Sequence, residues 1–179
     1  MTARDFIVKD TLRNGQEVTF RAVRPDDGAR IAKAFRQLDR ESVYTRFFTY
    51  KSELSNADLA RIEAIDFVRQ VMLVATILRE GDEIVIGGAS YIAHAAPDGA
   101  LTAEVAFTVE EDYQGLGIAG RLLGYLVGIA RDHGIVGFEA DVLADNKAML
   151  AVFTRAGLPM RQQRDGGVVH LAIDLVTPR

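Results

Sequence analysis

The amino-acid sequence predicts a mixed α/β domain in which helices flank a central, mostly antiparallel sheet. Several runs of alternating apolar residues are joined by short turns, which is typical of antiparallel strands. Only one pair of these runs is joined by a helical apolar pattern, so a single parallel pair is expected. The 179 residues, 49 % of them hydrophobic, suffice for one core, and we expect one domain over 1–179 that includes the N-terminal hairpin at 4–23.

The first third of the chain predicts a β-hairpin followed by helices. Asn14-Gly15 is a favoured tight-turn pair between two β-like runs. Pro25 suits the start of a helix, and the two aspartates after it suit the positive end of that helix. Ser55 or Asn56 is expected to cap a later helix. The predicted elements are a hairpin over 6–23 and helices over 24–41, 41–50 and 55–67.

The rest of the chain predicts a meander and then alternating helices and strands. Three consecutive β-like runs are joined by the turns "EGDE" and "APDGA", and Gly87-Gly88 marks a bulge. Asp145 is expected to cap the last helix, and Gly157 is expected to end it. The predicted elements are strands over 70–78, 84–95, 101–110 and 135–143, helices over 116–133 and 146–157, and a closing hairpin over 159–176.

Composition argues against several functional classes. The formal net charge is −4, whereas a nucleic-acid-binding domain would show a basic stripe. The chain has no cysteine, which excludes disulfides, thiolate metal sites and a cysteine nucleophile. The three histidines are scattered without ligand spacing, so no metal site is predicted. No apolar run reaches the roughly 20 residues of a membrane span. The N-terminal residues are too polar for a signal peptide, which makes the cytoplasm the expected location.

Three glycines lie within six residues in the stretch "YQGLGIAGRLL", between a predicted strand and a predicted helix. The first N–H groups of a helix have no internal partner and carry partial positive charge. A loop without Cβ atoms lets an anion approach these groups, so residues 114–120 predict a phosphate-binding turn. A tight turn that packs the helix closely on the strand is the alternative interpretation.

The same stretch is also a literal G-x-G-x-x-G, the fingerprint of dinucleotide-binding domains. That fingerprint normally opens a domain, whereas here many predicted elements precede it. The polar segment "EEDYQ" also separates the strand from the first glycine, and too few residues follow Gly120 to complete a doubly wound sheet. We therefore predict against a nicotinamide or flavin site.

These residues resemble the GCN5-related N-acetyltransferases (GNAT). The stretch "FTVEEDYQGLGIAGRLL" is similar to motif A of that family, with Gln114, Gly117 and Ala119 at the signature positions. The stretch "ADNKAMLAVFTRAGL" resembles the Asn-led helix of the following motif, with Leu158 in place of its Phe. The predicted element order matches the family over roughly 17–175. The resemblance implies the GNAT fold, with a splayed parallel strand pair, and is strongest to the bacterial protein-lysine acetyltransferase (Pat-like) branch.

The resemblance implies acetyl-CoA, or coenzyme A after the reaction, as the cofactor. Its pyrophosphate would lie on the backbone N–H groups of the glycine-rich turn, and its pantetheine arm would run along the end of the third meander strand. Leu116 stands where the family often has a basic residue, so the backbone amides would bind most of the phosphate charge, helped by Arg121. The implied cofactor-binding residues are Phe107, Thr108, Val109, Gln114, Gly115, Leu116, Gly117, Ile118, Ala119, Gly120, Arg121, Asn146, Met149 and Phe153.

Glu104 is the predicted general base, because an amine must lose a proton before it attacks a thioester. It interrupts an apolar strand and shares one face with Ala106 and Thr108, whose small side chains leave room for a substrate. We expect it to be partly buried, and a solvated glutamate is the alternative. "AEVAF" also resembles the "AEFA"-type strand that carries the catalytic Glu of the Pat-like branch. Because the chain has no cysteine, direct attack is favoured over an acyl-enzyme.

The general acid and the acceptor are less defined. Phe153 stands where many family members have a tyrosine acid. Residues 41–48, "ESVYTRFF", resemble the "ESRYLRFF" element near the acceptor groove of the Pat-like branch, with a plain amphipathic helix as the alternative. The predicted partners are acetyl-CoA and a protein lysine, with no nucleic acid and no membrane, and the oligomeric state stays open. A small-molecule amine acceptor and a non-catalytic acyl-CoA-binding module are the alternative functions.

Overall fold

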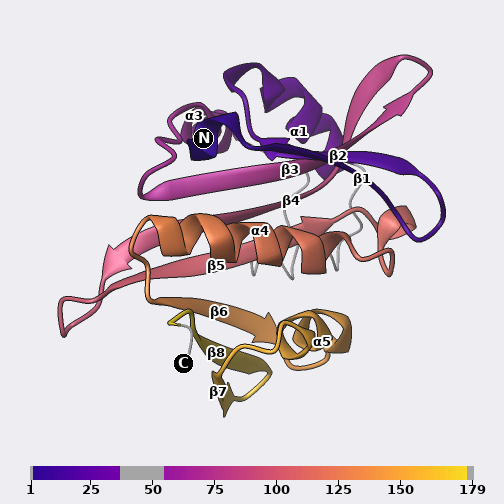
Figure 1. Cartoon of the computed structure of the whole chain (residues 1–179). Coiled ribbons are helices and arrows are strands. Elements are labelled where there is room, and N and C mark those ends of the chain that lie inside the picture. The colour runs from indigo at the N-terminus through magenta and orange to yellow at the C-terminus, as the bar shows by residue number, and fades with distance from the viewer. Residues whose placement is uncertain (1, 37–54, 177–179) are drawn as a thin grey trace.

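The computed structural model describes residues 2–36 and 55–176. The helix expected over 41–50, which carries the "ESVYTRFF" resemblance, lies outside these ranges. Within them, eight strands form one sheet in the order β1-β2-β3-β4-β5-β6-β8-β7 (Figure 1). The strands are β1 (Ile7–Thr11), β2 (Glu17–Ala22), β3 (Gln70–Arg79), β4 (Asp82–Ala95), β5 (Leu101–Val109), β6 (Gly137–Leu143), β7 (Met160–Asp165) and β8 (Val168–Asp174). The α-helices are α1 (Gly28–Arg36), α3 (Asn56–Glu63), α4 (Ile118–Asp132) and α5 (Lys147–Arg155), and the short 3₁₀ helices are η1 (Ala3–Asp5), η2 (Pro25–Asp27) and η3 (Glu111–Tyr113).

The sheet is antiparallel except between β5 and β6, which confirms the predicted fold class. The N-terminal hairpin turns at Asn14-Gly15, where Gly15 adopts a φ of 86°, and β2 pairs with β3 so that the hairpin extends the sheet. The β3–β4 register shifts at one point and leaves Ile86 as the extra residue of a bulge, directly before the predicted Gly87-Gly88 position.

The parallel pair of β5 and β6 is short and then opens. The two strands share three register pairs, of which Glu104 opposite Glu139 is the last among the described residues. β5 nevertheless continues to Val109 beside β4, and β6 continues to Leu143 beside β8. The strands therefore part after Glu104 and Glu139, and the sheet divides into a larger half, β1 to β5, and a smaller half, β6, β8 and β7 (Figure 1).

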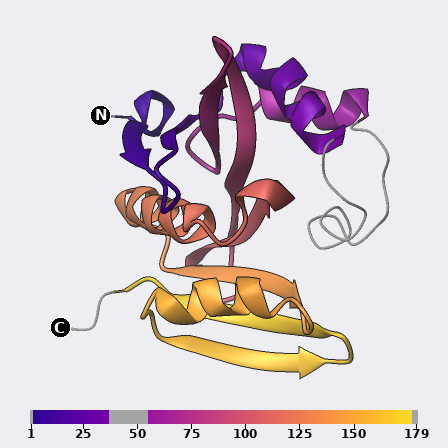
Figure 2. The same cartoon turned by 90° about the vertical axis from the view of Figure 1, so that its right-hand side faces the viewer.

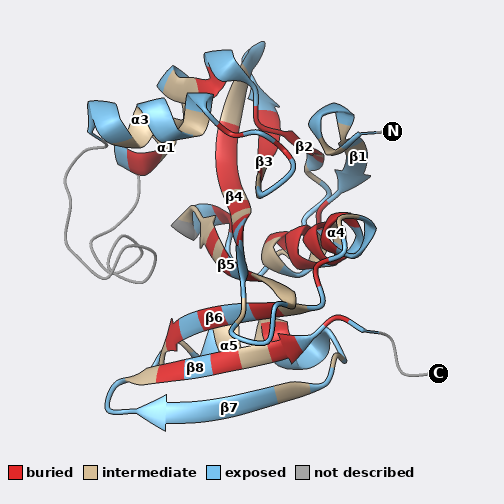
Figure 3. Ribbon diagram, turned by 90° about the vertical axis from the view of Figure 1, so that its left-hand side faces the viewer, coloured by how far each residue is buried: buried red, intermediate tan, exposed pale blue. Residues whose placement is uncertain are grey.

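Helices cover both faces of the sheet. α1 and α3 lie on one face of β3 and β4, and α4 lies on the other (Figure 2). On the α4 face, the fully buried Tyr91 of β4 forms a hydrogen bond through its hydroxyl with Nδ1 of His133, the C-cap of α4, at 3.1 Å. Burial raises the pKa of the Tyr91 phenol. The core therefore lies between α4 and the middle strands, while β7 forms an exposed edge (Figure 3).

No helix within the described ranges has both the length and the apolar character of a bilayer span.

Helix ends follow the predicted caps in part. Ser55 caps α3, accepting the N–H of Asp58 at 3.1 Å. Gly157 follows the end of α5 with a φ of 71°. The prediction of Asp145 as the cap of α5 is wrong: the next residue, Asn146, caps the helix, and its Oδ1 accepts the N–H of Met149 at 3.2 Å.

Asp27 lies in the first turn of η2, at a helix start as predicted, but its carboxylate is completely buried, which the sequence did not indicate. Arg21 donates two hydrogen bonds to the carboxylate, at 2.7 and 2.8 Å, and the backbone N–H of Arg24 donates a third at 2.7 Å. Glu83 also pairs with Arg21. Burial opposes ionisation of Asp27 more than any other single effect, but the hydrogen bonds from Arg21 and Arg24 together hold its pKa below the usual value.

Candidate active site

The turn before α4 leaves the N-terminus of that helix open. Gly115 and Gly117 have φ angles of 78° and 91°, in the left-handed region that glycine enters without a Cβ clash. Gly117 is the N-cap of α4 and has no side chain that could bind the first N–H groups. The N–H of Arg121 reaches the carbonyl of Gly117 at 3.2 Å, so the N–H groups before it have no intrahelical partner. These groups are available to an anion.

The glycine-rich turn is tied to the end of β5. Gln114 donates from Nε2 to the carbonyl of Val109 at 3.1 Å. The helix begins at Ile118, two residues later than predicted, and the side chain of Ile118 is buried beside Gly87 of β4. Leu116 and Ala119 are partly buried against the core. The apolar side chains of the predicted turn therefore pack against the core, while its glycines leave backbone groups exposed.

Two arginines reach the same turn. Arg13, at the tip of the β1–β2 hairpin, donates from Nη1 to the carbonyl of Gly115 at 3.3 Å. Arg121, predicted to assist in binding phosphate, forms an ion pair through Nε with Asp10 of β1 at 3.4 Å. Its Nη1 is buried without a partner among the described residues. Arg121 is therefore already engaged by the N-terminal hairpin.

The end of β5 and α5 meet beside the gap between β5 and β6. Phe153 of α5 is buried and contacts Phe107 of β5 edge-on, with ring centroids 5.6 Å apart. Met149 is partly buried in the same core. Asn146 uses Oδ1 to cap α5, which leaves its side-chain NH₂ as a donor. The structure thus brings Phe107 of β5 and Phe153 of α5 into contact, and a phenylalanine at this position offers no proton.

Glu104 lies at the last register pair before β5 and β6 part. Strand alternation places it on the face opposite Val105 and Phe107, which are buried. The expected partial burial is wrong, because Glu104 is exposed. The physical reason is that α4 and α5 pack on the other face of these strands, and no helix of residues 2–36 and 55–176 buries this side chain.

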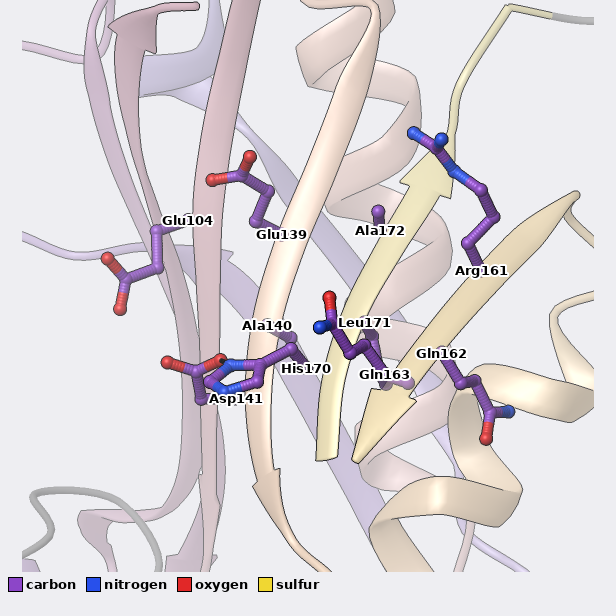
Figure 4. A pocket seen from close by; sticks show the side chains of 10 residues that line it. All are labelled: Glu104, Glu139, Ala140, Asp141, Arg161, Gln162, Gln163, His170, Leu171 and Ala172. Carbon is purple, nitrogen blue, oxygen red and sulfur yellow. Dashed lines mark hydrogen bonds and ion pairs between the residues drawn. The ribbon is translucent and has the colours of Figure 1, made fainter. Parts of the chain in front are cut away.

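A cavity of about 690 Å³ opens beside Glu104 on the face that α5 leaves free (Figure 4). Glu104 and Glu139 lie in one register row of the sheet, and Arg161 of β7 lies at the opposite side of the cavity. Two residues further along the strands and on the same face, His170 forms a close hydrogen bond through Nδ1 with the carboxylate of Asp141. The lining therefore holds three carboxylates and one arginine, and its negative charge is concentrated at Glu104 and Glu139, which favours a positively charged ligand beside them.

Sequence reasoning missed Arg13, Asp141 and His170. Asp141 and His170 occupy outward positions of alternating strands, so the period-two pattern could have placed them on one face with Glu139. Arg13 carries no comparable signal, because only the docking of the hairpin tip brings it to a turn that lies 102 residues further along the chain.

Comparisons with known proteins agree with this geometry. The model of the Acetyltransferase (GNAT) family matches residues 33–158. The chain is 33 % identical over 164 residues to the Acetyltransferase Pat of Mycolicibacterium smegmatis, and the match covers 92 % of this chain and 47 % of that protein. The chain therefore spans about half the length of this relative.

Solved structures extend the likeness to three dimensions. The GNAT domain of S. lividans PAT has a TM-score of 0.81 and 34 % identity, and the alignment covers 94 % of this chain and 96 % of that domain. A Salmonella typhimurium protein solved with its cofactor acetyl-CoA has a TM-score of 0.68 over 88 % of this chain and 91 % of its own, at 22 % identity, which shows a common fold.

The family match includes the glycine-rich turn, the open end of α4 and the splayed strand pair. The likeness to the S. lividans domain covers nearly the whole chain. The chain therefore belongs to the acetyltransferase (GNAT) family, whose cofactor is acetyl-CoA, and it resembles the Pat-like branch of that family.

Proposed function

We propose that this chain transfers an acetyl group from acetyl-CoA to an amine, and that the acceptor is a protein lysine side chain. The observation that carries the proposal is the arrangement around the gap between β5 and β6. The open N-terminus of α4 is tied to the end of β5 at Val109, while Glu104 lies where the strands part. Val109 is five residue steps along the strand from Glu104, so an arm of about 17 Å would connect a phosphate at the turn to a thioester beside Glu104.

The cofactor side uses backbone groups more than side chains. The first N–H groups of α4 would hold the diphosphate, assisted by the positive end of the helix dipole. Among the described residues, β5 has no partner strand on its β6 side beyond Glu104, and this edge would exchange hydrogen bonds with the amides of the pantetheine arm. The side-chain NH₂ of Asn146 would donate to the same arm. When bound, acetyl-CoA supplies the activated acyl thioester.

Glu104 would act as the general base. The carboxylate accepts a proton from the acceptor ammonium, the freed nitrogen forms a bond to the acetyl carbon, and the bond from that carbon to sulfur breaks. The thiolate leaves with its electron pair, and the nitrogen gives up its second proton, which reaches the thiolate through water because Phe153 has none to give. Exposure of Glu104 in the free chain is compatible with this role, since a docked acceptor would cover it.

The carboxylates of the cavity support a cationic acceptor. Glu104 and Glu139 place negative charge at the end of the cavity that lies farthest from Arg161, and an ammonium group gains most from such a surface before it loses its proton. A lysine side chain carries that group on a long flexible stem that can enter from outside. The choice of a protein over a small amine rests on the resemblance to the Pat-like branch.

An acyl-transfer assay with the purified chain tests this function. We expect labelled acetyl-CoA to acetylate lysines of a protein mixture, detected by mass spectrometry, and to acetylate free polyamines and aminoglycosides more slowly. Faster transfer to the small amines would overturn the lysine acceptor. Binding of coenzyme A without transfer to either class would instead show a non-catalytic acyl-CoA-binding module.

Replacing Gly117 by alanine is expected to destabilise the chain by about 1–2 kcal/mol, because an L-residue is strained in the left-handed region. The new Cβ would lie 3.8 Å from the nearest atom of Arg13, so the loss would come from the backbone and not from a clash. Urea unfolding measures it. The matched control is Gly124→Ala, within α4 and with open space around its Cβ, which should stabilise the chain by about 1 kcal/mol. Equal effects of the two substitutions would contradict the strained turn.

A further inference from the structure

We propose that Arg13 binds the diphosphate of coenzyme A and supplies the cation that this chain lacks at Leu116. The inference rests on the proposed function, since it assigns a further binding residue to the same cofactor. It deepens that function by making the N-terminal hairpin part of the cofactor site. Arg13 is far from the glycine-rich turn in sequence and reaches it only through the fold.

The position of Arg13 is defined by two sets of distances. Its Nη1 donates to the carbonyl of Gly115 at 3.3 Å. Its Nε and Nη2 lie 3.8 Å from the place where a Cβ of Gly117 would be. The guanidinium therefore lies beside the two left-handed glycines that open the N-terminus of α4. An anion on the first N–H groups of α4 would meet the guanidinium at this edge of the turn.

Arg13 also has further N–H donors that can bind a ligand. A guanidinium carries five N–H groups in a planar fork, and the bond to Gly115 uses one of them. That fork matches two oxygens of a phosphate group. Arg121 differs in that its partner is a carboxylate: Asp10 lies 3.4 Å from its Nε and offsets its charge, whereas the partner of Arg13 is a neutral carbonyl. The hairpin thus provides one carboxylate that engages Arg121 and one guanidinium that faces the turn.

Aromatic contacts hold the N-terminal hairpin, which carries Arg13, against α4. Tyr125 of α4 packs its ring between Phe6 and Phe20, with centroid distances of 5.0 and 5.4 Å. Figure 1 shows the β1–β2 turn reaching the end of α4 at which the glycine-rich turn lies. A side chain on a docked hairpin loses less freedom on binding a ligand than one on a loose segment. The aromatic contacts therefore position Arg13 before the cofactor arrives.

The experiment compares Arg13→Gln with Arg164→Gln in the full chain. Arg164 is a matched control, because it also lies at a hairpin turn and bonds a backbone carbonyl, that of Gly166, but on the opposite end of the sheet. We expect Arg13→Gln to raise the Kd for coenzyme A and the KM for acetyl-CoA about tenfold, with kcat unchanged. The Kd is measured by calorimetry, and thermal unfolding of the free variants reports any loss of fold.

Truncated ligands identify the group that Arg13 contacts. The same increase is expected with 3′-dephospho-coenzyme A, which keeps the diphosphate, and no increase with acetyl-pantetheine, which has no phosphate. Loss of the effect with the dephospho ligand would assign Arg13 to the 3′-phosphate and overturn the diphosphate assignment. An effect that persists with acetyl-pantetheine would show that Arg13 only supports the hairpin. Arg13→Lys should recover part of the affinity, because it restores the charge without the fork.

The failure of this inference is distinct from the failure of the proposed function. Tight binding of coenzyme A by both the unsubstituted chain and Arg13→Gln would overturn the role of Arg13 alone. An equal loss in Arg164→Gln would do the same, because it would show a general charge effect. No binding by the unsubstituted chain would overturn the proposed function and this inference together.

Discussion

Glu104→Gln is expected to lower kcat by about 10²- to 10⁴-fold and to leave the Kd for coenzyme A unchanged. The amide has nearly the shape of the carboxylate but cannot accept the proton of the attacking ammonium. The position of Glu104, at the last pair before β5 and β6 part, is what makes the effect specific to the transfer step. Initial rates with saturating acetyl-CoA and a lysine peptide measure kcat, and calorimetry measures the binding.

Glu139→Gln is the matched control for Glu104. It is the register partner of Glu104 on the neighbouring strand, lies on the same face and is similarly exposed. It also contacts His94 at 3.4 Å, so it is already partly engaged. We expect a change in KM for a cationic acceptor and little change in kcat. If Glu139→Gln stopped turnover and Glu104→Gln did not, the base would be on β6 and not on β5.

Asp27→Asn is expected to destabilise the chain by about 3–5 kcal/mol, the usual cost of removing one partner of a buried ion pair. Asp27 is fully buried and Arg21 is 2 % exposed, so the guanidinium would be left without its bidentate partner. The remaining contact with Glu83 places the expected loss at the lower end of this range. Urea unfolding with a constant m-value measures it. Asp26→Asn is the control, because that side chain is 72 % exposed and its pairing with Arg30 contributes at most about 1 kcal/mol.

The same carboxylate predicts how stability depends on pH. The pKa of Asp27 is lower in the folded chain than in the unfolded chain. Its contribution is therefore complete above the unfolded value of about 3.9 and is lost as the pH falls below it toward the folded value. Unfolding at a series of pH values should show the gap between the unsubstituted chain and Asp27→Asn narrowing below about pH 4. A gap that stays constant down to pH 2 would contradict the assigned pKa direction.

Local patterns were sufficient to predict the strands, the one parallel connection and the helices that lie within residues 2–36 and 55–176. The turn at Gly15 and the helix end at Gly157 were predicted because each needs a left-handed backbone conformation, which glycine adopts readily. The Asn146 cap was missed because Asp145 and Asn146 are both good caps, and a one-residue choice depends on how the chain leaves β6. The buried Asp27 was missed for a different reason, since its partners lie on other segments and the residue alone looks like an ordinary helix start.

The candidate site divides in the same way. The glycine-rich turn is a continuous stretch, so its spacing and the family resemblance identify it directly. The burial of Glu104 could not be read from its strand, because alternation gives the face but not what covers that face. Arg13 belongs to neither pattern, because its place beside Gly115 comes from the aromatic contacts that dock the hairpin on α4.

The parting of β5 and β6 has a consequence for self-association. A strand edge without a neighbour presents free backbone N–H and C=O groups that can pair with a strand of another molecule. Proteins usually protect such edges where they occur at the rim of a sheet. Among the described residues, β5 beyond Glu104 and β6 beyond Glu139 each have one such edge in the middle of the strand order and not at its rim. An extended molecule with its own amides would find backbone partners there. The fold thus keeps unpaired backbone N–H and C=O groups for an extended ligand inside the sheet, and not at its rim, where a second copy of the chain would pair with them.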